Sequence, residues 1–387
     1  MKINGEDFFM DISQFKSGSW IQQPTRYRSF LPNEINHQFT WADAELNILL
    51  EKATLRLGEL NSFSQFVPNI GMFIRMHVVK EATVSSRIEG TQTNIEEALL
   101  KVNDVAPERR DDWQEVTNYI TALNQALARL DTLPLSSRLL RETHATLLQG
   151  VRGEYKLPGE FRSSQNWIGG ATLADAVFVP PHHTDIGRLM GDLENFMHDE
   201  TIAVPHLIKI AVAHYQFETI HPFLDGNGRI GRLMIMLYLV SNQMLKEPIL
   251  YLSDFFDRNK SLYYDNLMIV RQNNNLTQWL KFFLVGVAQT AEKAIASLNA
   301  IIQLKQEAEN QILTLGRKAP TAKRLLDDLF AQPVLNAGDL AEKQGISLVS
   351  AYRLIDDFQR LGILHEATGF KRNRLFLFND YLEVFHR

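Results

Sequence analysis

Apolar residues recur at intervals of three or four through most of the chain, from Trp41 to about Gly316. This spacing places them on one face of a helix, so the region is predicted to be a set of packed helices. Its last part, Leu276 to Leu315, predicts long helices that lead out of the packed region. Residues 1 to about 40 lack the spacing and predict an irregular arm over the surface. We therefore expect a mainly α-helical protein.

Two of the predicted helices are joined by a short loop. The first helix covers Val204 to Ile220 and should be buried, because its apolar residues follow helical spacing. Pro222 disfavours helical geometry at the residue before it, so this helix should end near His221. The second helix begins after Gly228, where the apolar pattern resumes. The loop is therefore expected to be held between two core helices.

The chain from Pro320 onward has a different pattern. It predicts three short helices and then two strands of a hairpin, over Lys323–Phe330, Ala337–Gln344, Ser347–Leu361, 363–365 and 375–378. Residues 369–374 would form the tip of the hairpin. This order of elements resembles a winged helix-turn-helix domain.

The composition excludes several classes of protein. The chain of 387 residues contains no cysteine, which rules out disulfides, thiolate metal sites and a cysteine nucleophile. Its net charge of −5 gives no general attraction to nucleic acid or to an anionic membrane. The N-terminus lacks the layout of a signal peptide, and no apolar run is long enough to span a bilayer. We expect a cytoplasmic protein with no membrane partner.

The loop between the two core helices concentrates reactive and charged groups. From His221 to Arg232 the chain reads HPFLDGNGRIGR, which a simple connection between helices does not need. Gly226 and Gly228 lie where a helix begins, and there free backbone N–H groups attract anions while glycine admits close approach. Arg229 and Arg232 are three residues apart and share a face of that helix. The segment predicts a cradle for a polyphosphate.

The chemistry of the side chains limits what each can do at this cradle. His221 is a candidate general base for a hydroxyl nucleophile, because imidazole accepts a proton near neutral pH. Asp225 is a candidate ligand of Mg²⁺, which usually binds through one or two carboxylates plus substrate phosphates. Arg229 and Arg232 can neutralise charge on the phosphates as it shifts. Mg²⁺ is therefore the expected cofactor.

The same loop resembles the signature of the Fic (filamentation induced by cAMP) family, His-Pro-Phe-x-Asp/Glu-Gly-Asn-Gly-Arg-x-x-Arg, at every specified position. The resemblance implies a Fic-type helical core with a short β-hairpin flap. It implies transfer of AMP from ATP to a Tyr, Thr or Ser hydroxyl of a target protein, with release of pyrophosphate and His221 as the catalytic base. ATP and the target protein would be the partners. The nucleotide-binding residues that it implies are Gly226, Asn227, Gly228, Arg229, Ile230, Gly231, Arg232 and Tyr263.

A second motif lies upstream of the loop. Residues 85–90 read SSRIEG and resemble the inhibitory motif of the same family, Ser/Thr-x-x-x-Glu-Gly/Asn. Met72 to Glu89 predicts a helix, on which Ser85 and Glu89 share a face. The resemblance implies that Glu89 pairs with Arg232 and crowds the γ-phosphate site, so that the protein inhibits itself. The alternative is a solvated glutamate before a glycine that ends a helix.

The resemblance also covers the segment between the two motifs. Residues 159–162, 169–172 and 179–182 look like the flap of the family, a hairpin over the active site. An exposed strand edge there would bind the backbone of the target by strand addition. Downstream, Tyr263 matches a tyrosine that lies near the adenine in relatives, although its helical spacing from Leu267 fits a core residue equally well.

The expected domains are residues 1–110, with the arm and the inhibitory motif, a Fic catalytic core at 111–290, a connecting helix at 291–319 and a winged helix domain at 320–387. Ser347, Ser350 and Arg353 of the last domain would enter a DNA major groove. However, residues 320–387 contain nine Lys or Arg and nine Asp or Glu, whereas DNA binding rests on a basic surface. A protein partner or a homodimer is an equally good expectation.

The functional interpretation is a self-inhibited protein adenylyltransferase. One alternative is a DNA-binding regulator that senses a nucleotide, but a pure sensor needs no general base, so His221 favours the enzyme. A second alternative is the removal of AMP from modified proteins, with Glu89 positioning a water. The sequence does not identify the target protein or the modified residue.

Overall fold

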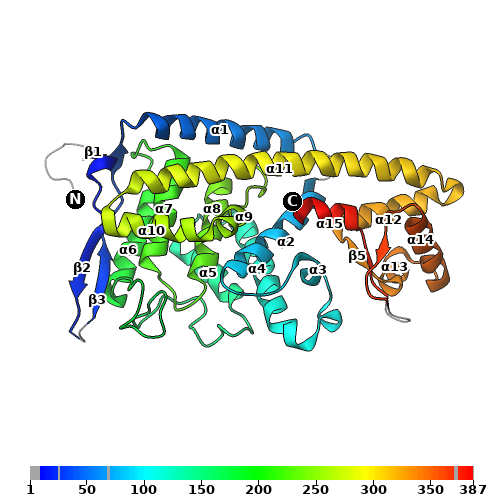
Figure 1. Ribbon diagram of the computed structural model, residues 1–387, viewed down its shortest axis with the longest axis horizontal. Coiled ribbons are helices and arrows are strands. Elements are labelled where there is room, and N and C mark those ends of the chain that lie inside the picture. Colours follow the sequence, from blue (N-terminus) through cyan, green and yellow to red (C-terminus); the bar gives the residue numbers. More distant parts are fainter. Residues whose placement is uncertain (1–8, 25–26, 68–69, 370–373, 387) are drawn as a thin grey trace.

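The structure is a computed structural model that describes residues 9–24, 27–67, 70–369 and 374–386. Helices form most of it, which confirms the mainly α-helical fold (Figure 1). The α-helices of the main body are α1 (Ala44–Ser64), α2 (Ile70–Ile88), α3 (Ile95–Ala98), α4 (Arg110–Arg129), α5 (Ser137–Leu147), α6 (Ile186–His198), α7 (His206–Ile220), α8 (Asn227–Ser241), α9 (Ser253–Arg258), α10 (Lys260–Asn273) and α11 (Leu276–Leu313). Short 3-10 turns lie at Ile12–Gln14, Val102–Asp104, Pro107–Arg109, His183–Asp185 and Gly316–Lys318.

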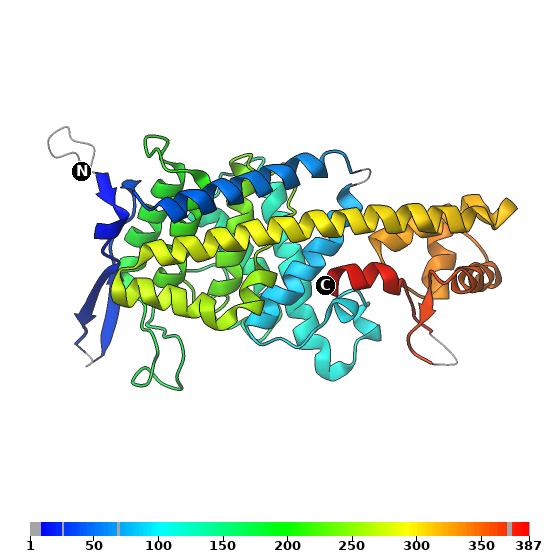
Figure 2. The ribbon, with the colours of Figure 1, turned by 45° about the horizontal axis from the view of Figure 1, so that its top comes forward.

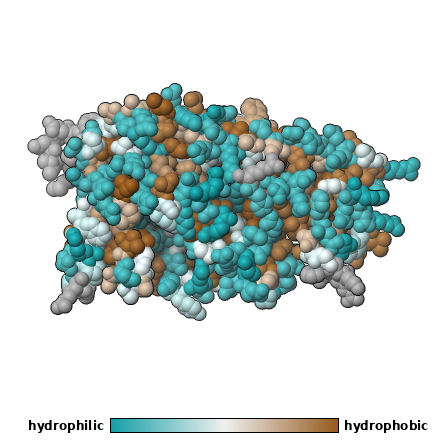
Figure 3. Space-filling view, in the orientation of Figure 1, coloured by the Kyte–Doolittle hydropathy of each residue, from teal (hydrophilic) through white to brown (hydrophobic). Residues whose placement is uncertain are grey.

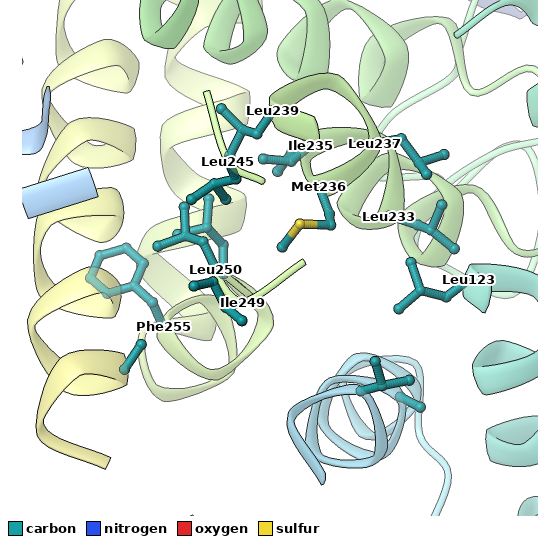
Figure 4. Packing of buried hydrophobic residues seen from close by; sticks show 14 of the residues in the cluster. Leu123, Leu233, Ile235, Met236, Leu237, Leu239, Leu245, Ile249, Leu250 and Phe255 are labelled. Atoms are coloured by element: carbon teal, nitrogen blue, oxygen red, sulfur yellow. The ribbon is translucent and has the colours of Figure 1, made fainter. Parts of the chain in front are cut away.

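Helices α7 and α8 lie at the centre of the main body. Every residue of α7 from Leu207 to Ile220 is buried, as expected for a helix surrounded on all sides. In Figure 4, apolar side chains of α8 such as Leu233 and Met236 pack towards Leu123 of α4 and towards the segment that precedes α9. Because packing fixes both helices, the loop between them has fixed ends.

Helix α11 is a single helix of 38 residues. The prediction of several helices in this stretch is therefore wrong. Gly286 does not interrupt α11, because the ring of Phe255 packs directly over it and a Cβ there would lie 2.7 Å from that ring. The first half of α11 packs along α1, and its second half extends beyond the main body (Figures 1 and 2).

The described part of the N-terminal region forms strands, so the prediction of an irregular arm is wrong. Strands β1 (Phe9–Asp11) and β4 (Gln38–Thr40) pair in parallel, and β2 (Gly18–Gln22) and β3 (Arg28–Pro32) form an antiparallel hairpin. Strands this short leave no readable alternation in the sequence. The hairpin packs on the segment before α6, where Phe30 donates a backbone hydrogen bond to Val179 (2.9 Å) and its ring contacts Phe178.

Residues 319–386, apart from the hairpin tip, form a second compact group, which we call the C-terminal module (orange to red in Figure 1). Its elements are α12 (Ala319–Ala331), β5 (Val334–Leu335), α13 (Ala337–Gln344), α14 (Leu348–Arg360), β6 (His365–Glu366), β7 (Phe376–Leu377) and α15 (Asn379–His386). The strands form an antiparallel sheet of order β5–β7–β6. The three predicted helices are confirmed, whereas β5 and α15 were not predicted. Residues 370–373, most of the predicted basic tip, lie outside the described residues.

The C-terminal module contacts the helix that carries the second motif. The ring of Phe385 lies edge-on to His77 of α2, with the ring centroids 5.2 Å apart. His386 contacts the carboxylate of Glu96 (Nε2–Oε1 2.6 Å), and Gln332 donates a hydrogen bond to the carbonyl of residue 99. Residues on both sides of the second motif thus contact the C-terminal module.

The face of the molecule seen in Figure 1 is largely hydrophilic, and its hydrophobic residues are scattered in small groups (Figure 3). Within the described ranges, no helix is both long and apolar enough to cross a bilayer.

Candidate active site

Two residues of the loop between α7 and α8 have left-handed backbone geometry. His221 ends α7 with φ 50° and ψ 60°, and Gly226 precedes α8 with φ 76°. The side chain of Asn227 closes the loop, because it accepts a hydrogen bond from the backbone N–H of Phe223 (2.8 Å) and donates one to the carbonyl of the same residue (2.9 Å). The predicted helix end near His221 is confirmed, and the loop has one fixed shape.

A buried histidine that the sequence did not single out supports this loop. The imidazole of His144 stacks on Phe223 with the ring centroids 3.8 Å apart. Its Nδ1 accepts a hydrogen bond from the backbone N–H of Gly159 (2.9 Å), so its Nε2 carries the proton and donates to the carbonyl of Asp225 (3.0 Å). His144 therefore holds Asp225 at the start of α8.

His221 lines the cavity with one face of its ring. Nδ1 is buried, so Nε2 is the nitrogen available to a bound molecule. Burial, together with the nearby cations of Arg271 and Arg162, lowers the pKa of His221 to about 3. Arg162 also donates to the carbonyl of His221 (3.0 Å) and fixes its backbone. The imidazole is therefore neutral and can accept a proton.

Arg229 is held by a carboxylate from a distant part of the chain. Its Nη1 lies 3.0 Å from Oε2 of Glu115, which is buried in α4, and its Nη2 lies 3.5 Å from Oδ1 of Asp225. Glu115 also pairs with Arg152 (2.7 Å). The side chain of Arg229 is consequently fixed beside the first turn of α8, next to Asp225.

Arg232 is bound by both residues of the second motif. Its Nε donates to Oγ of Ser85 (2.9 Å), and its Nη2 donates to the carbonyl of Ser85 (2.9 Å) and to Oε1 of Glu89 (2.7 Å). Burial alone would raise the pKa of Glu89, but Arg232 outweighs this and holds that pKa below its ordinary value. A Cβ on Gly228 would collide with Oε1 of Glu89. The Glu89 carboxylate therefore occupies space at the N-terminus of α8.

A cavity of about 480 Å³ opens beside these groups. At one end it is bounded by Glu89, Gly228 and Arg232, where the α8 N-terminus favours an anion. At the other end it is bounded by apolar and aromatic side chains, among them Phe178, Tyr263, Tyr264, Leu267 and Met268. A polar end joined to an apolar end suits a nucleotide better than a free phosphate.

Tyr263 is both a core residue and a wall of the cavity. It is 1% exposed, its ring stacks on Phe256 (centroids 4.3 Å apart), and its hydroxyl is hydrogen-bonded to Nε2 of His214 (2.9 Å). Both interpretations of the sequence thus describe part of its role. Because its hydroxyl is already hydrogen-bonded to His214, Tyr263 could contact a bound base only through its ring.

The segment expected to be a hairpin flap is less regular than predicted. Its two arms meet at a single antiparallel bridge between Ile168 and Phe178, and residues 177–179 do not form a strand. Arg162 does not belong to these arms; it binds the carbonyls of Ile220, His221 and Pro181. The arms still cover the apolar end of the cavity.

Not all of the predicted nucleotide-binding residues face the cavity. His221, Gly228, Arg232 and Tyr263 line it, together with Glu89. Ile230 is fully buried and belongs to the core, and the side chain of Asn227 is used to close the loop. Gly231 is needed for packing, because a Cβ there would collide with Glu218. Gly226 supplies the left-handed turn before α8.

Asp225 has a carboxylate oxygen, Oδ2, that could serve as a ligand of Mg²⁺. Its side chain is 39% exposed, and Oδ1 accepts a hydrogen bond from the N–H of Gly226 (2.6 Å), which leaves Oδ2 open. Within the described ranges no three potential ligands gather around one point. One carboxylate is sufficient where substrate phosphates and water complete the octahedron of Mg²⁺.

Glu218 is a residue of the cavity that the sequence analysis missed. It lies on α7 one turn before His221, it is 6% exposed, and it lines the cavity. Its Oε1 is buried without a hydrogen-bond donor. Burial raises the pKa of Glu218 to about 7, although Arg232 opposes the shift. No local pattern marks such a residue, because a glutamate late in a helix is ordinary.

We expect the raised pKa of Glu218 to make the protein less stable as pH rises. The folded state keeps a proton that the unfolded state releases from about pH 4.5, so stability falls between pH 4.5 and 7 and then levels off. A shift of this size amounts to as much as about 3 kcal/mol. Glu218→Gln lacks the titration, so its melting temperature should rise relative to that of the unaltered protein from pH 5 to pH 8. A difference that is the same at both pH values would contradict this account.

The fold and cavity define a helical protein with a cavity at the N-terminus of the buried helix α8. Two adjoining family models match the chain. The Fic/DOC family N-terminal model covers residues 48–128, and the Fic/DOC family model covers residues 134–239, which includes the whole loop. Residues 48–128 and 134–239 therefore match the Fic/DOC family, as the motifs predict.

Several curated relatives are named protein adenylyltransferase Fic. The protein from Drosophila willistoni is 28% identical over 218 residues, covering 53% of this chain and 40% of the relative. The protein from Drosophila grimshawi is 39% identical over 132 residues, covering 34% of this chain and 26% of the relative. The chain thus spans less than half the length of these relatives.

A solved structure supports the fold. The crystal structure of a Fic family protein from Desulfovibrio desulfuricans G20 matches with a TM-score of 0.57 and 19% sequence identity. The match covers 87% of this chain and 96% of that protein.

Proposed function

We propose that this protein transfers AMP from ATP to a hydroxyl side chain of a target protein. The observation that carries the proposal is a single cavity in which His221, the N-terminus of α8 and Arg232 meet. The names of the curated relatives agree with this activity. A nucleotide-sensing regulator would need the anion cradle and the apolar end, but not a neutral imidazole at the junction of the two.

The arrangement assigns a task to each group. Nε2 of His221 accepts the proton of the target hydroxyl, whose oxygen forms a bond to the α-phosphorus while the bond to the bridging oxygen of the β-phosphate breaks. Pyrophosphate leaves with that electron pair. Arg229 and the N–H groups of α8 stabilise the charge that builds up on it. Phosphates beside His221 would raise the pKa of the imidazole and make it a stronger base.

Mg²⁺ would be held by Asp225 together with the phosphates and would neutralise part of their charge. His144 and Arg229 orient this carboxylate, the first through the Asp225 carbonyl and the second through Oδ1.

The same geometry supports self-inhibition. Arg232 can bind a γ-phosphate only if its guanidinium is free, whereas here it is held by Ser85 and Glu89. The carboxylate of Glu89 also places a negative charge where the γ-phosphate would approach α8. ATP would then bind with its phosphates displaced, in a pose that does not favour transfer. The reverse reaction, with Glu89 holding a water against a modified hydroxyl, is the competing role for the same carboxylate.

The position of the label tests the proposed reaction. The Glu89→Gly protein is incubated with Mg²⁺, a cell lysate and ATP labelled in either the α- or the γ-phosphate. We expect protein labelling from α-labelled ATP only, with pyrophosphate released in equal amount. Labelling from γ-labelled ATP would identify a kinase instead. Binding of ATP without labelling from either would favour a nucleotide sensor.

We also propose that the C-terminal module is a winged helix domain that binds a protein. The order of its helices and its three-stranded sheet supports this class of fold. On α14 the would-be recognition surface exposes Leu348 (52%) and Val349 (61%), which suits a protein surface better than DNA. A second copy of the chain is one such partner.

A gel-shift assay with the full chain tests whether DNA is a partner. We expect no specific duplex to be bound at nanomolar concentration in physiological salt, because residues 320–387 carry nine Lys or Arg and nine Asp or Glu. Arg353→Ala serves as the control on α14. Nanomolar binding that weakens steeply with salt and is lost in Arg353→Ala would make DNA the partner.

A further inference from the structure

Glu218 occupies a defined place between the two ends of the cavity. On one side Arg232 and Glu89 are close enough to act on its carboxyl group electrostatically, the first lowering and the second raising its pKa. On the other side it is close enough to Tyr263 to influence the phenol electrostatically. One oxygen of the carboxyl group is buried against the backbone of Gly231, on the second turn of α8. The carboxyl group therefore lies on the wall that joins the anion end to the aromatic end.

A nucleotide that fills this cavity has its parts in a fixed order. Its phosphates go to Gly228 at the start of α8, and its base goes to the apolar end beside Tyr263 and Leu267. The sugar joins the base to the phosphates, so it must pass the wall between the two ends. Glu218 is the acidic side chain of the lining at that level; the other acid, Glu89, lies at the phosphate end and is paired with Arg232.

The carboxyl group of Glu218 has hydrogen-bonding capacity to offer. No hydrogen bond of its side chain is formed within the described part of the protein, and Oε1 is buried without a donor. Oε1 packs against Gly231 and is closed to a ligand, so Oε2 is the oxygen that can accept a hydrogen bond from a molecule in the cavity. The hydroxyls of ribose are donors, and 2′-deoxyribose and 3′-deoxyribose each lack one of them.

We propose that Glu218 accepts a hydrogen bond from a ribose hydroxyl of the bound nucleotide, so that the site selects ribonucleotides over deoxyribonucleotides. This inference rests on the proposed function, because it requires a nucleoside triphosphate in the cavity. It assigns to Glu218 a role in substrate specificity and none in proton transfer. A deoxyribonucleotide lacks the hydroxyl, so it would leave the carboxyl group of Glu218 without a donor and would bind less tightly.

Calorimetric titration of the full chain with ATP, 2′-deoxy-ATP and 3′-deoxy-ATP in Mg²⁺ tests the inference. At pH 8, where Glu218 is ionised, a hydrogen bond to the charged carboxylate changes affinity by about 10- to 100-fold, so ATP should bind more tightly than at least one deoxynucleotide by that factor. In Glu218→Ala, the affinity for ATP should fall to that for the same deoxynucleotide. The affinity for the deoxynucleotide should change little. Glu218→Gln keeps a carbonyl acceptor and should retain part of the discrimination.

Glu81→Gln is the matched control, since Glu81 is also buried in a helix but is held outside this cavity by Tyr119 and Ser253. This variant should discriminate as the unaltered protein does. Equal affinity of the unaltered protein for all three nucleotides, or discrimination that persists in Glu218→Ala, would overturn the role of Glu218 and leave the proposed AMP transfer standing. Failure of all three nucleotides to bind would overturn both.

Discussion

Replacing His221 with alanine should abolish the transfer of AMP while nucleotide binding stays nearly unchanged. The ring lies at the junction of the two ends of the cavity, and the anion end is built from α8 and the arginines. A general base contributes about 100- to 10,000-fold to a rate, so labelling should fall by at least about 100-fold. The rate is measured with α-labelled ATP in the Glu89→Gly protein, and ATP affinity is measured by calorimetry.

The backbone at this position calls for a second variant. His221 has φ 50°, a conformation that asparagine tolerates better than alanine does, so His221→Asn tests the loss of the base with less strain. It should be as inactive as His221→Ala. His365→Ala, which changes an exposed histidine of β6 outside the cavity lining, is the control and should retain full activity. A rate near that of the parent protein in both His221 variants would remove this residue from the mechanism.

The sequence predicted the centre of the fold well, because the signals there are local. The helix from 204 to 220 and its end near His221 follow from apolar spacing and from Pro222, and both are observed. The short strands β1 to β4 were missed, since three to five residues carry no readable alternation, and the position of the β2–β3 hairpin depends on contacts with Phe178 and Val179. Long-range packing decided those elements.

The same distinction separates the site residues that were found from those that were missed. His221, Asp225 and the arginines share one short segment with a recognisable motif. Glu115 and His144 come from α4 and α5, and each acts only because folding brings it to that segment. Glu218 lies one turn before His221, but only the packing of α7 on α8 shows that it lines the cavity. A glutamate inside a helical pattern looks the same whether it faces solvent or a buried arginine. Long-range partners of this kind cannot be read from local sequence.

Replacing Glu89 with glycine should raise labelling of the protein itself or of its target severalfold or more. Of the three hydrogen bonds that hold the guanidinium of Arg232, this change removes the charged one, and the two to Ser85 remain. It also removes the carboxylate beside Gly228, so like charges no longer oppose the γ-phosphate. Initial rates with α-labelled ATP, compared with the unaltered protein at equal concentration, measure the effect.

Three variants separate release of Arg232 from a general loosening of α2. Arg87 lies in the last turn of α2, within the second motif, and forms an ion pair with Asp257 of α9. Arg87→Ala breaks this pair and should leave the rate unchanged. Glu89→Gln keeps the shape of the side chain without its charge and should activate partly. Arg232→Ala should be inactive, and Glu89→Gly should not rescue it, because the arginine is itself needed to bind the phosphate.

The pattern across these variants decides the role of the carboxylate. Activation by Glu89→Gly but also by Arg87→Ala would mean that the stability of the helix end, and not the pairing with Arg232, restrains the enzyme. Unchanged or lower labelling in Glu89→Gly, together with loss of AMP removal from a modified protein, would assign Glu89 to the reverse reaction. Activation confined to changes of Glu89 itself would leave the ion pair with Arg232 as the restraint, because only those changes remove both the charged hydrogen bond and the negative charge at the start of α8.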